Sequence, residues 1–344
     1  MLFLFDIILK ICYDNSMKVA AFEVHDYEDK DFLSANKYGL EVTCYRERLT
    51  KETLPLVKGC EGVNILGFSI LDEALLTALS EMGVKYIATR TIGYNHIDTK
   101  AAKRLNIKLS NASYSPHNVA DFTVMLMLML LRKAKVALIR ALSNNFSLDG
   151  MMGKELRSMT VGIVGAGKIG KAVIENLSGF GCKILVFDPF VSESALPQNA
   201  TLVSLDELLK NADILSLHVP YTKENHHLID RERIQMMKRG ALLVNTARGD
   251  LVDTEALIEA LESGQLAGAG IDTVEDEENV SHVDLGTKIV GKRNLFYLKQ
   301  LPNVIYTPHI AFFSEEASSA MVHSALESLR LFEANEPNPY EIKV

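Results

Sequence analysis

Short apolar runs alternate along this chain with longer stretches in which apolar residues recur at helical spacing. This alternation is typical of a parallel β-sheet covered by helices, so the pattern predicts an α/β protein. Strands are predicted at residues 18–24, 62–68, 86–90, 108–112, 160–164, 183–187, 214–218, 241–245, 269–272 and 304–307. Helices are predicted at residues 72–82, 99–105, 119–131 and 171–179, and a tail helix at about 315–335 ends before Pro337.

The same pattern divides the chain into two halves. Its 344 residues exceed the roughly 100 to 200 residues of a typical single domain, so two domains are expected. A glycine-rich turn follows the strand at 160–164 but not the strand at 18–24, which indicates that only the second half is built for a dinucleotide. The boundary is placed near Tyr114-Ser-Pro116, because proline restricts the residue before it and often begins a helix. The tail helix can return to the first half.

Two apolar stretches resemble membrane segments but are too short to be one. Residues 1–12 contain Asp6 and Lys10, and residues 119–131 are followed at once by basic residues, whereas a bilayer span takes about 20 apolar residues. Because Met17 directly precedes the strand at 18–24, we predict that residues 1–16 are an N-terminal extension from an upstream start.

The composition excludes several classes of function. The chain is 48% hydrophobic and 23% charged, which is ordinary for a soluble globular protein. Its net charge of -8, without a dense run of Lys or Arg, argues against a nucleic-acid surface and against binding to an anionic membrane. The four cysteines show no CxxC spacing and no histidine at metal-ligand spacing, so neither disulfides nor a metal site are predicted. We expect a cytoplasmic enzyme.

A dinucleotide-binding motif follows the strand at 160–164. It reads G-x-G-x-x-G at Gly165, Gly167 and Gly170 and leads into a helix. The first glycine permits a tight turn, the second lets a pyrophosphate approach the backbone, and the third lets the helix pack closely. Asp188 ends the next strand near the expected distance of roughly 20 residues, where a carboxylate binds the ribose hydroxyls and repels a 2′-phosphate. The motif therefore favours NAD over NADP, and the alternative is an exposed Asp beside a glycine turn needed only for packing.

Several further motifs, in order, resemble the D-isomer-specific 2-hydroxyacid dehydrogenases over nearly the whole chain after Met17. They are Leu217-His-Val-Pro220, Leu243-Val-Asn-Thr-Ala-Arg-Gly249, Gly270-Ile-Asp-Thr-Val-Glu-Asp-Glu277 and Asn303-Val-Ile-Tyr-Thr-Pro-His309. In the first half, residues 85–98 and 114–116 are most similar to D-lactate dehydrogenases and to the pyruvate reductases of vancomycin-resistance operons.

The resemblance implies a fold and an assembly. It implies two Rossmann- or flavodoxin-like, doubly wound parallel-sheet domains, with an NAD-binding domain (residues 115–310) inserted into a split substrate domain (residues 1–114 and 311–344). It also implies a homodimer to whose core residues 119–132 contribute.

Two residues at the ends of predicted strands have the chemistry that reduction of a 2-oxo acid needs. Arg248 follows the strand at 241–245, and its planar guanidinium suits a carboxylate and an adjacent carbonyl oxygen. His309 follows the strand at 304–307, and imidazole is well matched to proton transfer near neutral pH. The alternatives are an ion pair of Arg248 with Asp250 or Asp253, and a structural histidine.

The third catalytic residue is selected by the resemblance alone. The family order Arg, Glu, His matches Arg248, Glu277 and His309, and a carboxylate bonded to the imidazole would orient it. Glu275, Asp276 and Glu278 are close rivals of Glu277 for this role.

The resemblance also implies the residues around the reactants. The substrate is expected to contact the backbone N–H groups of Ile92 and Gly93 and the side chains of Tyr114 and Phe312, although both aromatic residues could equally be ordinary core residues. The cofactor is expected to contact Gly165, Gly167, Lys168, Ile169, Gly170, Asp188, His218, Val219, Pro220, Thr246, Ala247 and, at the nicotinamide end, Asp272.

The predicted reaction is NADH-dependent reduction of a small 2-oxo acid, with pyruvate favoured, to the D-2-hydroxy acid, here D-lactate. Hydride comes from nicotinamide C4 and the proton from His309. One alternative is a dehydrogenase for a bulkier D-2-hydroxy acid, and another is an NAD-sensing regulatory protein on the same fold.

Two features have no predicted role. The segment 279–298 is long and charged, with Lys288, Lys292 and Arg293, and departs from the family pattern. His96, His117, His226 and His227 have no recognisable constellation around them in the sequence and are assigned no chemistry.

Overall fold

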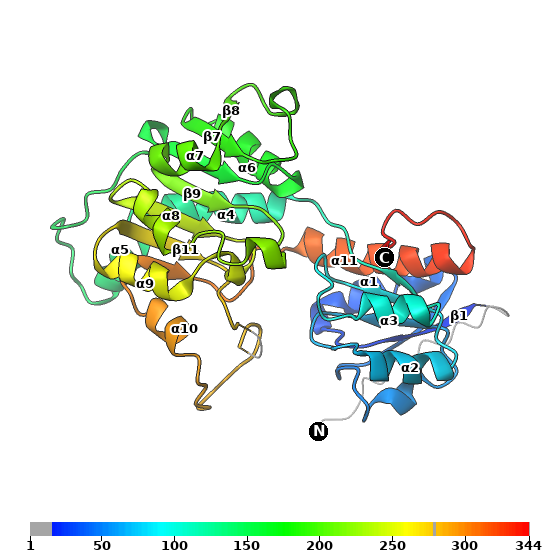
Figure 1. Ribbon diagram of the computed structural model, residues 1–344. Helices are drawn as coiled ribbons and strands as arrows, with labels where there is room; N and C mark the ends of the chain where they lie inside the picture. The colour runs from blue at the N-terminus through cyan, green and yellow to red at the C-terminus, as the bar shows by residue number, and fades with distance from the viewer. Residues whose placement is uncertain (1–15, 278–279, 344) are drawn as a thin grey trace. The chain divides into compact units, whose positions relative to one another are not determined.

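A computed structural model describes residues 16–277 and 280–343 and shows two compact units (Figure 1). Unit 1 comprises Met1–Ser115 and Ser314–Val344, and unit 2 comprises Pro116–Phe313. The predicted N-terminal extension, residues 1–16, lies outside the described residues except for Ser16. Each unit is a parallel β-sheet with helices on both faces, which confirms the predicted fold class. No helix in the described part of the chain is long and apolar enough to cross a membrane.

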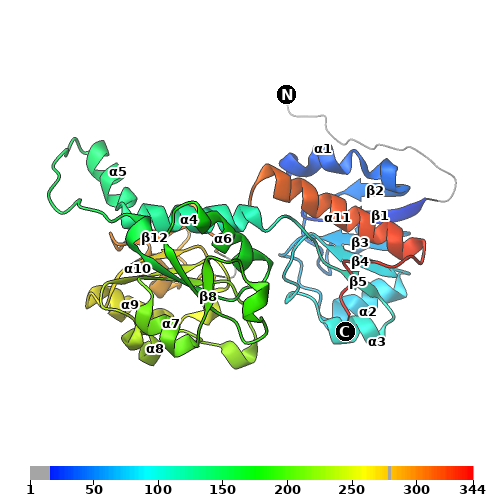
Figure 2. The same ribbon diagram turned by 90° about the horizontal axis from the view of Figure 1, so that it is seen from above.

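Unit 1 is built on a five-stranded sheet in the order β2-β1-β3-β4-β5. The strands are β1 Met17–Ala21, β2 Leu40–Cys44, β3 Gly62–Ile65, β4 Tyr86–Thr89 and β5 Lys108–Ser110. The α-helices are α1 Asp29–Phe32, α2 Glu73–Glu81, α3 Thr99–Arg104 and α11 Glu315–Glu333. Figure 2 shows α1 and α11 on one face of the sheet and α2 and α3 on the other. Alternate β1 residues supply the two cores, Val19 on the α11 side and Ala20 on the α2 side.

A buried ion pair lies where β1, β3 and β4 end. Arg90 directly follows β4, and its side chain and that of Glu28 are fully buried with Nε and Oε1 2.9 Å apart. The same guanidinium also donates to the Asn64 side chain and to the carbonyl oxygens of Phe22 and Glu23. The charge of Arg90 is thus compensated in the interior of unit 1.

Unit 2 is built on a seven-stranded sheet in the order β12-β11-β10-β9-β6-β7-β8. The strands are β6 Thr160–Val164, β7 Lys183–Phe187, β8 Ala200–Leu202, β9 Ile214–Leu217, β10 Ala241–Asn245, β11 Leu266–Ile271 and β12 Val304–Tyr306. The α-helices are α4 His117–Leu131, α5 Ala134–Leu142, α6 Lys168–Ser178, α7 Leu205–Asn211, α8 Arg231–Met236, α9 Thr254–Glu262 and α10 Arg293–Leu298. Helices α4 and α6 cover one face, and α7 to α10 cover the other.

The strand order of unit 2 reverses between β6 and β9, which lie side by side although two strands separate them in the chain. Ligands of open parallel sheets bind outside the carboxyl ends of the strands at such a reversal. The loops that follow β6 and β9 are therefore the expected place for a ligand.

Every strand that the apolar pattern predicts is present, often one to three residues shorter at its end. The pattern missed β2 and β8, which are both edge strands. An edge strand is covered on fewer sides, and both contain exposed residues, so neither has the continuous apolar run of a central strand.

Candidate active site

The glycine turn after β6 has the shape that a dinucleotide pyrophosphate needs. Gly165 has a φ of +95°, and a Cβ there would lie 2.7 Å from the carbonyl oxygen of His218. A Cβ on Gly170 would lie 2.0 Å from the carbonyl oxygen of Gly165. A Cβ on Gly167 would meet no atom within 4 Å. Packing therefore requires the first and third glycines, and the second leaves the backbone at the start of α6 open to an approaching anion.

Asp188 lies beside this turn, at the end of β7. Its Oδ2 accepts a hydrogen bond from Ala166 N at 2.8 Å, and its Oδ1 accepts one from Phe190 N at 2.9 Å. Because the side chain is only half-buried and each carboxylate oxygen can accept more than one hydrogen bond, ribose hydroxyls can still be bound there. The residues of this site therefore fit NAD.

The segment that follows β9 packs against the glycine turn. His218 packs its backbone against Gly165, and its Nε2 lies 2.9 Å from Ser216 Oγ. Burial lowers the pKa of His218 to about 3, so its imidazole is neutral at physiological pH. Val219 and Pro220 follow it, and Val219 also contacts the place where a Gly165 Cβ would lie.

Thr246 and Ala247, which follow β10, are held by hydrogen bonds inside unit 2. The Thr246 hydroxyl lies 2.9 Å from the hydroxyl of Thr123 on α4, and both are buried. Ala247 N donates to the side chain of Asn245 at 3.0 Å. The two hydrogen bonds fix the position of this segment at the end of β10.

The structure pairs His309 with Glu277. His309 Nδ1 lies 2.6 Å from Glu277 Oε1, and Glu277 Oε2 accepts a hydrogen bond from Val274 N at 3.1 Å. Both side chains are part-buried, with 30% of His309 and 17% of Glu277 exposed. A carboxylate on Nδ1 fixes the ring and leaves Nε2 for proton transfer.

The rivals of Glu277 are arranged differently. Glu275 lies 2.6 Å from His227 Nε2 and accepts a hydrogen bond from Thr254 N, so it faces away from His309. Asp276 has a φ of +57°, a turn conformation, and Glu278 lies outside the described residues. Among the residues described, the geometry thus agrees with the family order.

Arg248 follows β10 at the same end of the sheet. Asn245, which is buried, donates to the Arg248 carbonyl oxygen at 2.8 Å, and the guanidinium donates to the carbonyl oxygen of Ala247 at 2.6 Å. In the described part of the chain Arg248 forms no ion pair with Asp250 or Asp253, so the alternative explanation for it finds no support. Its guanidinium keeps donors for a substrate.

Gly249, which follows Arg248, packs against the backbone of Val274 and Glu275, shortly before Glu277. A Cβ on Gly249 would lie 2.0 Å from the carbonyl carbon of Val274 and 2.4 Å from Glu275 N. No side chain fits in that space. The backbones that bear Arg248 and Glu277 are therefore in direct contact.

Asp272 anchors the loop that carries His309. Its fully buried carboxylate accepts hydrogen bonds from Thr307 Oγ1 at 2.5 Å and from Ile310 N and Ala311 N at 2.9 Å each. His309 N donates to the Asp272 carbonyl oxygen at 2.8 Å. His309 itself has a φ of +57°, which is uncommon for a residue other than glycine, so the loop needs such an anchor. The predicted nicotinamide contact of Asp272 stays a prediction.

His282 and Phe312 lie next to His309. His282 Nε2 is 2.7 Å from the His309 carbonyl oxygen, and the ring of Phe312 meets those of His282 and His309 edge-on at 5.9 Å and 6.3 Å. The family resemblance predicts Phe312 near the substrate, whereas no motif in the sequence points to His282. That residue lies in the segment 279–298, where no motif gives a register, and only tertiary contact identifies it.

Ile92, Gly93 and Tyr114 lie in unit 1. Ile92 and Gly93 form the loop that follows β4, and Ile92 is exposed. Within the described residues their N–H groups donate no hydrogen bond, while the carbonyl oxygen of Ile92 accepts from Asn111 and that of Gly93 from Thr91. Two backbone donors at the end of a parallel strand are thus available to an anion. Tyr114 is part-buried near the end of the unit's first chain segment.

Comparison with known proteins agrees with this arrangement of residues. The family model described as "D-isomer specific 2-hydroxyacid dehydrogenase, NAD binding domain" matches residues 124–311. An aromatic 2-oxoacid reductase of Clostridium sporogenes is 43% identical over 320 residues, which cover 92% of this chain and 96% of that protein. A D-specific alpha-keto acid dehydrogenase of Enterococcus faecalis is 43% identical over 85% of this chain and 88% of its own length. The crystal structure of a D-lactate dehydrogenase of Treponema pallidum superimposes with a TM-score of 0.88 at 34% identity, covering 95% of this chain and all of that one.

Proposed function

Because the chain belongs to the D-isomer-specific 2-hydroxyacid dehydrogenases and is an NAD-dependent enzyme of that family, we propose that it reduces a small 2-oxo acid, with pyruvate favoured, to the D-2-hydroxy acid. The observation that supports this most directly is the hydrogen bond of 2.6 Å between His309 and Glu277 beside an NAD-binding fold. For pyruvate the product is D-lactate.

The proposed reaction uses a catalytic trio, Arg248, Glu277 and His309, and each of these residues has one role. Arg248 binds the carboxylate and the carbonyl oxygen of the 2-oxo acid through its remaining donors. Glu277 holds the imidazole through Nδ1, and His309 gives the proton on Nε2 to the carbonyl oxygen. NADH, when bound, supplies the hydride that C2 receives.

We assign the remaining contacts on the same basis. The N–H groups of Ile92 and Gly93 bind the substrate carboxylate, and Tyr114 and Phe312 border its substituent. The cofactor is bound by Gly165, Gly167, Lys168, Ile169, Gly170, Asp188, His218, Val219, Pro220, Thr246, Ala247 and Asp272. Residues 115–310 would then form the NAD-binding domain, and residues 1–114 with 311–344 the substrate domain.

Two observations bear on the size of the preferred substrate. Pyruvate is favoured because the first half of the sequence is most similar to lactate-type members of the family. A bulkier, aromatic 2-oxo acid is the second candidate, since a relative with that name is 43% identical and aromatic rings of Phe312, Phe313 and His282 gather beside His309.

Turnover of a substrate panel distinguishes the two readings. NADH oxidation is followed at 340 nm with pyruvate, 2-oxobutyrate, phenylpyruvate and 2-oxoisocaproate, and the configuration of the product is then determined. Highest kcat/KM for pyruvate with D-lactate as product supports the first reading, and preference for phenylpyruvate supports the second. NADH binding without turnover of any of these oxo acids would contradict the proposed substrate class.

A His309→Gln variant tests the proton donor. We expect kcat to fall by about 10²- to 10⁴-fold, the usual contribution of general acid catalysis. The Kd of NADH, measured from the change in its fluorescence on binding, should stay the same. His117→Gln, a histidine outside the trio, is the matched control and should keep its kcat. Equal kcat in both variants would remove His309 from the mechanism.

We also propose that the protein is a cytoplasmic homodimer. Helix α5 has no buried residue, and its Leu138, Ile139 and Leu142 are 62%, 56% and 88% exposed. Next to it on α4, Met125 and Met129 line an apolar groove of about 420 Å³. Apolar surface of this extent favours burial against a second copy. Light scattering should give twice the mass of 38.1 kDa, and a Leu138→Asp/Leu142→Asp double variant should give the monomer mass.

A further inference from the structure

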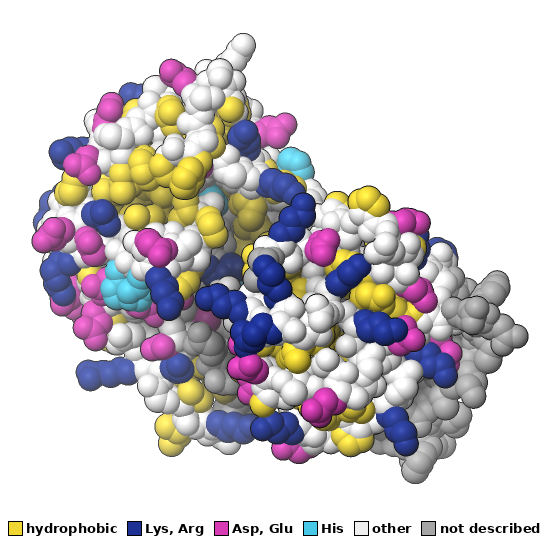
Figure 3. Space-filling view, turned by 45° about the vertical axis from the view of Figure 1, so that its right-hand side comes forward, with side chains coloured by type: hydrophobic (Ala, Val, Ile, Leu, Met, Phe, Trp, Pro, Cys, Tyr) yellow, Lys and Arg dark blue, Asp and Glu magenta, His cyan; other side chains and the backbone are white. Residues whose placement is uncertain are grey.

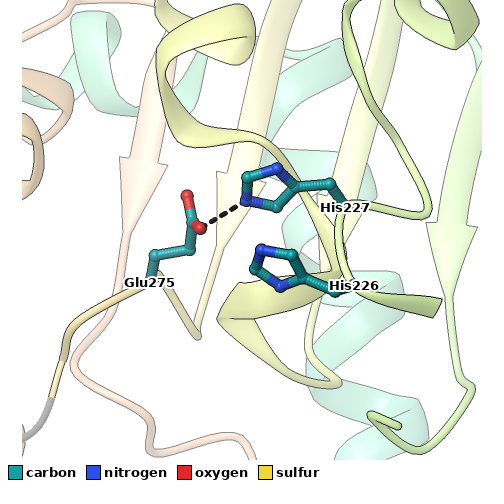
Figure 4. A group of neighbouring side chains, drawn as sticks. All are labelled: His226, His227 and Glu275. Atoms are coloured by element: carbon teal, nitrogen blue, oxygen red, sulfur yellow. Dashed lines mark hydrogen bonds and ion pairs between the residues drawn. The ribbon is translucent and has the colours of Figure 1, made fainter. Parts of the chain in front are cut away.

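Three side chains that the proposed reaction does not use come together in unit 2. His226 and His227 precede α8, and Glu275 follows β11, yet one ligand atom from each lies within 4.8 Å of the other two (Figure 4). His227 Nε2 and Glu275 Oε1 are 2.6 Å apart, and the two imidazole rings stack with centroids 3.9 Å apart. The prediction that these histidines have no constellation around them is therefore wrong, because the partner lies 48 residues away in the chain.

Two of the three side chains are held in place by their surroundings. Backbone N–H of His227, a residue with a φ of +52°, donates to the Asp250 carbonyl oxygen at 2.8 Å. Glu275 Oε2 accepts from Thr254 N at 2.9 Å, at the start of α9. Burial alone would raise the pKa of the Glu275 carboxyl, but hydrogen bonds from Thr254 and His227 outweigh it and lower that pKa. The carboxylate is therefore charged at neutral pH.

The third side chain, His226, is exposed and able to move. Its ring is held by stacking on His227 and by an edge contact with Tyr221 at 6.0 Å. Figure 4 shows a nitrogen of each imidazole on the side of the cluster that faces the Glu275 carboxylate. On the face of the molecule in Figure 3, histidine side chains reach the surface among acidic ones. His226 is exposed and His227 and Glu275 are only part-buried, so a cation in solvent can reach this cluster.

We propose that His226, His227 and Glu275 form a binding site for a divalent transition metal ion, with Zn²⁺ as the reference ligand. Two imidazole nitrogens and one carboxylate oxygen suit Zn²⁺, Co²⁺ or Ni²⁺, whereas Mg²⁺ and Ca²⁺ prefer oxygen ligands alone. Three protein ligands leave a fourth tetrahedral position for water. The ion would replace the hydrogen bond between His227 and Glu275.

The rearrangement that this binding needs is small. Metal–ligand distances of about 2.1 Å at a tetrahedral angle separate the two ligand atoms by about 3.4 Å, so the present 2.6 Å between His227 and Glu275 must widen by about 0.8 Å. The His226 ring must also turn out of its stack, since rings inclined by only 24° do not aim their nitrogens at one point. Exposure of His226 permits that rotation.

An ion at this site would connect the loop after β9 with the loop after β11. Glu275 lies two residues before Glu277, and its backbone is in contact with Gly249, the neighbour of Arg248. The ion itself would lie outside the proposed proton-transfer pair, because Glu275 and Glu277 contact different histidines. We therefore expect a structural ion that raises the thermal unfolding temperature by binding the folded state only.

Metal binding is tested on the full chain, produced without a histidine tag and treated with a chelator. Titration calorimetry with Zn²⁺ and the visible absorption of added Co²⁺ should give one strong site per chain. His226→Asn should weaken Zn²⁺ binding at least about tenfold, in the range seen when metal sites lose a supporting group, with little effect on folding because the side chain is exposed. His117→Asn, another exposed histidine, is the matched control and should bind like the parent.

Two results would overturn the proposal. One is equal Zn²⁺ affinity of the parent, His226→Asn and Glu275→Gln proteins, which would place the bound ion elsewhere. The other is absence of Zn²⁺ and Co²⁺ binding at millimolar metal, which would leave His227 and Glu275 as an ion pair only. Both readouts are independent of oxo-acid turnover, so they do not depend on the proposed function.

Discussion

Replacing Asp272 with Asn should loosen the loop of His309 while leaving the size of the side chain almost unchanged. The fully buried carboxylate accepts three hydrogen bonds, from Thr307 Oγ1, Ile310 N and Ala311 N. An Asn oxygen can retain the first two, but its NH₂ group then faces Ala311 N, so that two donors meet. One charge-assisted hydrogen bond is lost, and a buried donor is left without an acceptor.

The magnitude follows from these contacts. A hydrogen bond to a charged group contributes about 1.5–3 kcal/mol, and an unsatisfied buried donor costs a further 1–3 kcal/mol, part of which is offset by removal of a buried charge. We expect the free energy of unfolding of unit 2 to fall by about 2–4 kcal/mol. His309 holds a φ of +57° that costs a residue other than glycine about 1–2 kcal/mol. Without a firm anchor it leaves this conformation, and kcat should fall about 5- to 30-fold, as about 1.4 kcal/mol corresponds to each factor of ten.

Urea unfolding and steady-state kinetics measure the two effects. The matched control is Asp230→Asn, which makes the same chemical change at the N-cap of α8, where Asp and Asn are equivalent caps. Its unfolding midpoint and kcat should stay close to those of the parent. If Asp272→Asn unfolds at the same urea concentration and keeps its kcat, the carboxylate is not the anchor of the loop.

Three further predictions concern other contacts. Glu28→Ala leaves Arg90 charged and buried in unit 1 and should lower its free energy of unfolding by about 3–5 kcal/mol, measured by urea denaturation; a change below 1 kcal/mol would contradict this. Gly249→Ala places a methyl group where the backbone of Val274 lies and should reduce kcat and the unfolding temperature together. Gly179→Ala, whose methyl group would meet no atom within 4 Å, should change neither. Burial depresses the pKa of His218 in the folded state to about 3. As pH falls below the ordinary pKa of about 6.5, the unfolded chain therefore takes up a proton on this imidazole and the folded chain does not. The free energy of unfolding should then decrease between pH 6.5 and 3 by up to about 1.4 kcal/mol per pH unit. A His218→Gln variant should lose less stability over that range than the parent, and an equal slope in both would exclude His218 as the cause.

The sequence alone was sufficient for the local features of this protein. Central strands such as Ala241–Asn245 are buried on both faces and therefore read as continuous apolar runs. The glycine turn could be read as well, since Gly165 and Gly170 are required by the geometry of one turn and one helix start. Asp188 and the ends of the strands that carry Arg248 and His309 follow from the same short-range order. Edge strands β2 and β8 escaped because partial exposure removes the pattern.

Contacts between distant residues required the tertiary structure. Four acidic residues stand at 275–278, and no local property distinguishes them, yet the turn directs Glu277 to His309 and Glu275 to His227. The burial of Asp272 beneath the His309 loop and the position of His282 depend equally on how β11 and β12 lie side by side. Periodicity reports which face of an element is buried, because burial acts on each residue separately. Which two side chains meet depends on the packing of whole strands and loops, and that is decided only when the chain is folded.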